Sequence, residues 1–94
     1  MPDTKTVRLL IKGRVQGVWY RGWTVEQATA RGLSGWVRNR ADGAVEVLVR
    51  GSAAVVDDMV NACRRGPPSA RVDHIDLSPS ADSVSGGFHQ RPTV

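Results

Sequence analysis

The chain has 94 residues and a formal net charge of +4, with 13 Lys and Arg residues against nine Asp and Glu residues. This length predicts one domain, residues 1–94, and no apolar run approaches the ~20 residues that cross a bilayer, so we expect neither a membrane span nor a secretory signal. A single cysteine, Cys63, excludes an intramolecular disulfide and every multi-cysteine metal site, and it favours a cytoplasmic location.

The first predicted strand spans residues 7–11, where apolar side chains at every second position indicate one buried face. The stretch GRVQGVWYR, residues 13–21, follows as a loop with two glycines and two arginines. Residues 22–32 then predict a short helix, because Val25 and Ala28 stand at helical spacing, an acidic residue comes early and a basic residue comes late.

Two strands joined by a tight turn are predicted next, over residues 33–40 and 44–51. Three valines at alternate positions of the second strand share one face. Asp42-Gly43, between the strands, is a typical turn dipeptide of a two-stranded hairpin. The two strands are therefore expected to pair antiparallel.

A second helix is predicted over residues 52–65. Ser52 can cap its N-terminus, two arginines stand in its last turn, and Gly66 with two following prolines ends it. Cys63 shares the inner face of this helix with two other apolar residues, so it is expected to pack rather than to react.

The remaining chain predicts a fourth strand over residues 70–77, a polar surface loop over residues 78–87 and a short edge strand over residues 86–94. The element order is therefore β-α-β-β-α-β. This order is typical of an α+β, ferredoxin-like sandwich, in which a four-stranded antiparallel sheet carries two helices on one face. The C-terminal strand would be a short extra strand at the sheet edge.

The predicted topology places two distant segments side by side. In this fold the first two strands run parallel with the third between them, so the loop at residues 13–21 and Asn39 should be neighbours at one edge of the sheet. Two strand spacings of ~4.8 Å separate those strands by ~10 Å. A folded loop and an arginine side chain can span that gap around a small ligand.

The loop at residues 13–21 has the composition of an anion-binding site. Backbone N–H groups between a strand and a helix N-terminus can form a concavity for an anion, and Gly13 and Gly17 permit the backbone conformations that it needs. The planar guanidinium group of Arg21 can donate hydrogen bonds to two oxygens of a phosphate or a carboxylate. The alternative is that both glycines only turn the chain and Arg21 is a surface residue. The loop is not a Walker A motif, because no Gly-Lys-Ser/Thr follows.

Three aromatic residues, Trp19, Tyr20 and Trp23, lie in or beside this loop. Packing around the loop is their expected role, and a stacking surface is the alternative. His74 and His89 lie in predicted strands far along the chain and are expected to have structural or surface roles. No cluster of residues has metal-ligand spacing, so no metal is expected.

Two linked motifs resemble those of a known family. GRVQGVWYR and the later GLSGWVRNRADGAVEV are similar to the acylphosphatase signatures Gly-x-Val-Gln-Gly-Val-x-Phe-Arg and Gly-Trp-Val-x-Asn, the latter followed by Asp-Gly-x-Val-Glu. The resemblance extends through GPPSARVDHIDL and so covers nearly the whole chain, whereas SPSADSVSGG is at best loosely related. Tyr20 stands where the family usually has Phe, a change expected to adjust packing beside the loop.

The resemblance implies a metal-independent enzyme without cofactors that hydrolyses acyl phosphates to a carboxylate and inorganic phosphate. By this likeness Arg21 and Asn39 are catalytic, since Arg21 binds the phosphoryl oxygens and the Asn39 side chain orients the attacking water. The same likeness assigns phosphate binding to the backbone N–H groups of Gln16, Gly17, Val18, Trp19 and Tyr20. The expected partner is a small acyl phosphate, with inorganic phosphate or another oxyanion in the same loop, and the expected state is a monomer.

Two other functions fit parts of the sequence. An RNA-binding module has the same fold and a basic charge, but the strand at residues 44–51 lacks the aromatic residues that stack on bases, so no nucleic acid is expected. A regulatory domain could bind an acyl phosphate or another anion without turnover. The presence of both Arg21 and Asn39 favours catalysis over binding alone. The net charge of +4 by itself is also explained by a solvated basic surface that binds no partner.

Overall fold

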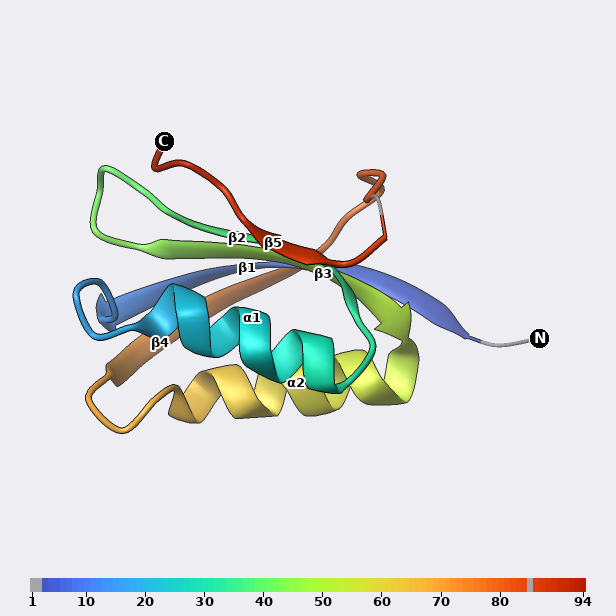
Figure 1. The fold of residues 1–94 in the computed structure, drawn as a ribbon, viewed down its shortest axis with the longest axis horizontal. Coiled ribbons are helices and arrows are strands. Elements are labelled where there is room, and N and C mark those ends of the chain that lie inside the picture. The colour runs from blue at the N-terminus through green and yellow to red at the C-terminus, as the bar shows by residue number, and fades with distance from the viewer. Residues whose placement is uncertain (1–2, 85) are drawn as a thin grey trace.

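The computed structural model describes residues 3–84 and 86–94, and its elements follow the predicted order (Figure 1). The elements are β1 (Thr4–Arg14), α1 (Tyr20–Ala30), β2 (Ser34–Asn39), β3 (Val45–Ser52), α2 (Ala53–Arg65), β4 (Arg71–Pro79) and β5 (Phe88–Gln90). Within the described residues, neither helix is long and apolar enough to cross a membrane.

The five strands form one sheet in the order β4-β1-β3-β2-β5. The four longer strands pair antiparallel, with Leu9 opposite Val47 and Val37 also opposite Val47, which confirms the predicted ferredoxin-like arrangement. The short extra strand is also confirmed, but β5 pairs parallel to β2, so the sheet is mixed. Its partner could not be read from sequence, because the chain crosses from one edge of the sheet to the other between β4 and β5.

The core lies between the sheet and the two helices, which cover the same face (Figure 1). The period of two in the strands places alternate residues on this face, as predicted. Fully buried side chains from the strands and from α2 meet there, namely Leu9, Ile11, Val37, Val45, Val47, Val49, Val56, Met59 and Cys63.

The opposite face of the sheet has no helical layer, and arginines cover its buried groups. Glu46, only 2% exposed, accepts hydrogen bonds from the Nε atoms of Arg8 and Arg38. The guanidinium groups of Arg38 and Arg91 lie 4.5 and 4.8 Å from the centroid of the Trp36 ring. Charge pairing and cation–π contacts therefore stabilise this face.

The helix ends differ from the prediction in two details. α1 begins at Tyr20 rather than at residue 22, and its buried face includes Thr24, whose hydroxyl donates to the Tyr20 carbonyl over 2.8 Å, while Val25 is only half-buried. Ser52 occupies the predicted N-cap position of α2, but its side chain makes no capping hydrogen bond.

Candidate active site

The loop after β1, the β2–β3 turn and the C-terminal segment lie at one end of the molecule, on the left of Figure 1. A pocket of about 120 Å³ opens there. Its lining is Val15, Gly17, Trp19, Tyr20, Arg21, Gly22, Asn39 and Gln90. The structure thus brings Arg21 and Asn39 together, as the topology predicted. The pocket is smaller than the ~300–1,000 Å³ of sites that enclose drug-sized ligands, so it suits one small group.

Gly13 allows the chain to leave β1 at this point. Its φ is +133°, and a Cβ built there would lie only 2.2 Å from the Arg71 carbonyl oxygen. The pairing of β1 with β4 shifts register between Lys12 and Gly13. A side chain at this position would push the two strands apart, so the loop depends on this glycine.

In the loop at residues 13–21, left-handed backbone conformations occur at alternate positions, Gly17 and Trp19. Gly17 and Trp19 have φ values of +75° and +66°, whereas the residues on either side of each have negative φ. Left-handed residues that alternate with residues of negative φ can turn successive N–H groups toward the same side and so form a concavity that favours anions. This conformation supports the predicted nest over the alternative of a simple turn.

The N-terminus of α1 adds further positive potential at the same place. Trp19 is the N-cap residue, no side chain caps the helix, and its first turn contains no acidic residue. The first N–H groups of a helix have no partner within the helix, and the helix dipole places partial positive charge beside them. Arg21 stands half-buried in this turn and takes part in none of the ion pairs found among the described residues.

The Gln16 side chain fixes the loop to the neighbouring hairpin. Its Nε2 donates to the carbonyl oxygens of Arg40 and Ala44, over 2.8 and 2.9 Å. The sequence interpretation assigned only the backbone N–H of Gln16 and missed this bridge. No local signal predicts it, because both acceptors are backbone atoms of a turn more than twenty residues away.

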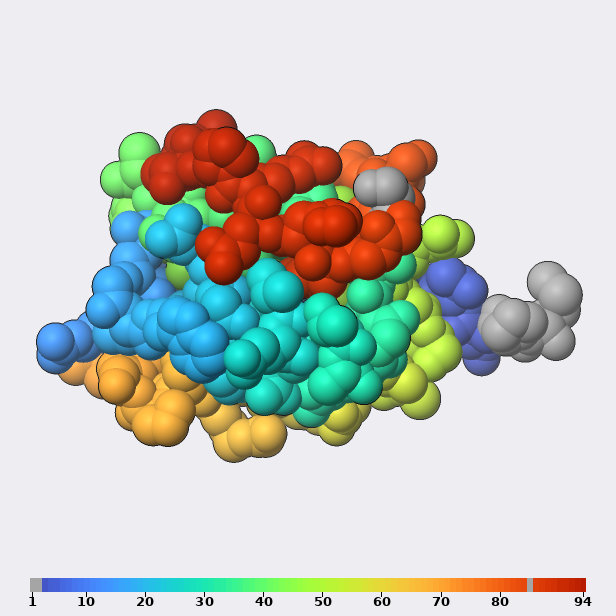
Figure 2. Space-filling model, in the orientation of Figure 1, coloured from blue at the N-terminus to red at the C-terminus, as the bar shows by residue number. Residues whose placement is uncertain are grey.

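Asn39 is held from the other side by the end of the chain. Its carbonyl accepts from the Val94 N–H over 3.1 Å, and the Ala41 N–H donates to the Val94 carbonyl over 2.7 Å. Gln90 in β5 lines the pocket, and Figure 2 shows the C-terminal residues in red packed directly against α1. The sequence analysis missed this contribution, since it depends on the parallel pairing of β5 with β2.

Tyr20 and Trp23 pack beside the loop, as predicted. The buried Tyr20 hydroxyl donates to the Cys63 carbonyl over 2.6 Å, and its ring meets Trp23 edge-on at 5.3 Å. Burial raises the pKa of Tyr20 well above its usual 10, and burial also raises the pKa of the Cys63 thiol to about 12. Both groups are therefore neutral near pH 7. Trp19 is 60% exposed, so of the predicted core or rim packing only packing at the rim applies to it, where its ring lies against Gly22.

The two histidines lie away from the pocket. The exposed His74 ring on β4 is 2.6 Å from an Asp76 carboxylate oxygen, and the exposed His89 ring on β5 is 3.2 Å from the Gly86 carbonyl oxygen. Neither lines the pocket that contains Arg21. Among residues 3–84 and 86–94, no three His, Cys, Asp or Glu side chains gather as metal ligands would.

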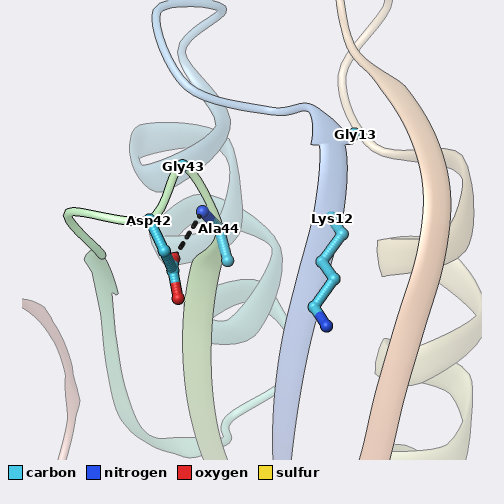
Figure 3. Close-up of a pocket in the computed structure, with 5 residues that line it drawn as sticks. All are labelled: Lys12, Gly13, Asp42, Gly43 and Ala44. Carbon is cyan, nitrogen blue, oxygen red and sulfur yellow. Dashed lines mark hydrogen bonds between the residues drawn. The ribbon is translucent and has the colours of Figure 1, made fainter.

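A second, more open hollow of about 380 Å³ lies between the end of β1 and the β2–β3 turn (Figure 3). Its lining is Lys12, Gly13, Asp42, Gly43 and Ala44. Asp42 accepts the Ala44 N–H over 3.0 Å, drawn as the dashed line in Figure 3, and that bond, with the contact from Arg40, lowers the pKa of Asp42. An anion here would meet this carboxylate, so the hollow is a poorer phosphate site than the pocket at Arg21.

Known proteins resemble this chain in sequence and in fold. The sequence model of the acylphosphatase family matches residues 7–90. An acylphosphatase of Rhodospirillum rubrum is 58% identical over 96% of this chain and 99% of its own, and one of Rhizorhabdus wittichii is 55% identical over 99% and 94%. The crystal structure of an acylphosphatase from Bacillus subtilis is 34% identical, covers 92% of this chain and 97% of its own, and superposes with a TM-score of 0.86. The chain belongs to the acylphosphatase family.

Proposed function

We propose that this acylphosphatase hydrolyses the carboxyl–phosphate bond of acyl phosphates in the pocket between Arg21 and Asn39. One observation carries the proposal. Arg21 and Asn39 come from different elements, yet they line the same small pocket at the uncapped N-terminus of α1. A cationic side chain that can bind an anion and a neutral amide side chain thus line one pocket, which is large enough for a phosphoryl group.

The phosphoryl group would be bound by the loop and by Arg21. The left-handed residues at 17 and 19 would turn the N–H groups of residues 16–20 to one side, and α1 would add its dipole. The Arg21 guanidinium can donate two parallel hydrogen bonds to phosphoryl oxygens. These donors would stabilise the charge that spreads over the equatorial oxygens during phosphoryl transfer.

Asn39 would orient the attacking water. Its side-chain carbonyl oxygen can accept one water proton and so direct an oxygen lone pair toward phosphorus. A neutral amide is too weak a base to remove this proton, so a phosphoryl oxygen would accept it. The hydrogen bond from the Val94 N–H to the Asn39 carbonyl, together with the one from the Ala41 N–H to the Val94 carbonyl, would keep the Asn39 backbone in place.

The bond changes balance without an acid from the protein. The water oxygen forms a bond to phosphorus, the bond from phosphorus to the acyl oxygen breaks, and its electron pair leaves with the carboxylate. The conjugate acid of this leaving group has a pKa of about 4 to 5, close to those of Asp and Glu, so the carboxylate departs unprotonated near pH 7. Only positioning and charge stabilisation are then required of the protein.

The test is hydrolysis of benzoyl phosphate by the parent and by Arg21→Ala and Asn39→Ala, with competitive inhibition by inorganic phosphate measured in each. We expect both variants to keep only a small residual turnover, which phosphate should no longer inhibit in Arg21→Ala but should still inhibit in Asn39→Ala. Arg50→Ala, at an exposed arginine on β3, is the matched control. Equal loss of phosphate inhibition in both variants would contradict the role given to Asn39.

The same assay includes EDTA. Among the residues that line the pocket, Arg21 is cationic, Asn39 and Gln90 are neutral amides and none is a carboxylate, so the lining attracts an anion rather than a divalent cation. Turnover should therefore persist in the chelator. Complete loss of turnover in EDTA, restored by a divalent metal, would contradict the metal-independent reaction.

A further inference from the structure

Trp19 is an unusually placed aromatic residue. At 60% exposure it is the most exposed large apolar side chain of the described residues, above Val94 at 57% and Leu77 at 45%. Its backbone is also unfavourable, since φ +66° and ψ +23° place it in the left-handed region. Gly, Asn and Asp adopt this conformation far more readily than a bulky residue does. Neither core packing nor backbone preference therefore explains a tryptophan at this position.

The indole has a defined position beside the pocket. Trp19 lines the same pocket as Arg21 and Asn39. A Cβ built at Gly22 would lie 2.2 Å from the indole Nε1 and 2.7 Å from Cε2, so the ring rests against the first turn of α1 where Gly22 leaves room for it. Any larger residue at position 22 would displace the ring. The pair of Trp19 and Gly22 thus builds an aromatic wall at the pocket rim.

The size of the pocket decides where the substrate's acyl group lies. About 120 Å³ suits a phosphoryl group and leaves no space for a benzoyl or longer chain beside it. Once the phosphoryl group is bound below, the acyl group extends to the rim. We infer that the indole of Trp19 is the surface on which the acyl group packs, which favours aromatic and long apolar acyl groups over acetyl. This inference rests on the proposed function of the pocket.

The test compares two non-hydrolysable phosphonates that share the phosphoryl contacts. Dissociation constants of benzylphosphonate and methylphosphonate are measured by titration calorimetry for the full chain. An aromatic contact of this kind predicts that benzylphosphonate binds the parent about three- to tenfold more tightly. The ratio of the two constants isolates the acyl contact, because any change in the phosphate loop affects both ligands equally.

Trp19→Asn removes the ring and keeps a residue that tolerates the left-handed conformation, so the ratio should fall to near one. Trp19→Phe should retain most of the preference. Leu77→Asn makes the same replacement at an exposed apolar residue on the far edge strand β4 and should keep the parent ratio. Circular dichroism confirms that each variant folds.

An unchanged ratio in Trp19→Asn, or no preference in the parent, would overturn the role of Trp19. Hydrolysis of acetyl phosphate by the parent is measured separately. If the parent hydrolyses acetyl phosphate but Trp19→Asn leaves the ratio of dissociation constants unchanged, only the role of Trp19 is contradicted and the proposed catalysis stands. A Trp19-dependent ratio in a parent that hydrolyses nothing would support the acyl surface and contradict the proposed catalysis.

Discussion

Arginines occupy two contrasting settings in this molecule. On the open face of the sheet, Arg8 and Arg38 donate to the buried Glu46 carboxylate, and Arg38 also stacks on Trp36. At the pocket, Arg21 makes no ion pair with any described residue and lies in the first turn of α1. The first setting satisfies its charges within the fold, whereas the second leaves a cation facing a cavity.

The position of Arg21 is electrostatically unfavourable for the folded chain alone. A cation at a helix N-terminus opposes the helix dipole, typically by about 0.3–1 kcal/mol. When a phosphoryl group is bound, the electrostatic energy of the site becomes favourable, because both the helix dipole and the Arg21 guanidinium attract the anion. The comparison teaches that a basic residue indicates function here by lining a small cavity at a helix N-terminus without an ion pair to any described residue, while net charge does not distinguish the two settings.

The largest expected effect separates these settings directly. Arg21→Ala should reduce kcat/KM for benzoyl phosphate by about a hundredfold or more and should leave the free energy of unfolding equal to or slightly above that of the parent. Arg38→Ala should show the reverse, with a lower stability and near-parental turnover per folded molecule. Urea unfolding and steady-state kinetics measure both. A clear loss of stability in Arg21→Ala would mean that Arg21 is structural.

The next effect concerns the buried carboxylate. Glu46→Gln keeps the shape but removes the charge that pairs with Arg8 and Arg38, so the free energy of unfolding should fall by about 1–3 kcal/mol. Activity per folded molecule should stay near that of the parent. Glu26→Gln, at an exposed residue of α1, is the control and should change stability by less than about 0.5 kcal/mol. Equal effects of the two substitutions would show that the Glu46 pairs add no stability.

The same group predicts a pH dependence. Burial by itself would raise the pKa of Glu46, but the hydrogen bonds from Arg38 and Arg8 outweigh it and hold the pKa below its usual 4.5. The unfolded chain then binds the proton more readily, so this contribution is present above about pH 4.5 and is lost as the pH falls through the lower pKa of the folded state.

Urea midpoints at pH 7 and pH 3 measure this loss. Asp42 and Asp76 also have lowered pKa values, so the parent loses stability at acid pH through several groups. The Glu46→Gln variant should therefore lose less stability than the parent over the same interval. Identical losses in the two proteins would contradict the assignment to Glu46.

The smallest effect concerns the support of the loop. The Tyr20 hydroxyl donates to the carbonyl of Cys63 in the last turn of α2, where helix carbonyls lack partners within the helix. Tyr20→Phe should lower the free energy of unfolding by about 0.5–1.5 kcal/mol and should change turnover little, since Arg21 keeps its place. Thermal unfolding and benzoyl phosphate kinetics check this. An unchanged stability would show that water replaces the hydroxyl at no cost.

Much of the fold could be predicted because its signals are local. The alternation in β1 and β3, the Asp42-Gly43 turn and the glycine after α2 each lie within a few residues, and together they define the element order. That order then predicted that Arg21 and Asn39 would line one pocket. The burial of Cys63 followed from its place on the inner face of α2.

Most of the omissions lie where residues distant in the chain meet. The exposed position of Trp19 is a local exception, because neither its left-handed backbone nor the contact of its ring with Gly22 is visible in a hydrophobic pattern. The Gln16 bridge ends on backbone carbonyls of the β2–β3 turn. The contribution of Gln90 requires the parallel pairing of β5 with β2.

The sequence by itself determined the order of the elements, the two motifs and the residues that they contain. The tertiary structure alone decided which edge of the sheet receives β5, how Gln16 and Val94 hold the two halves of the site, and that Trp19 faces solvent beside the pocket. The physical reason is range. Periodicity and turn chemistry act between near neighbours in the chain, whereas the pairing of β5 and the hydrogen bonds of Gln16 and Val94 join groups that only the folded sheet brings within hydrogen-bonding distance.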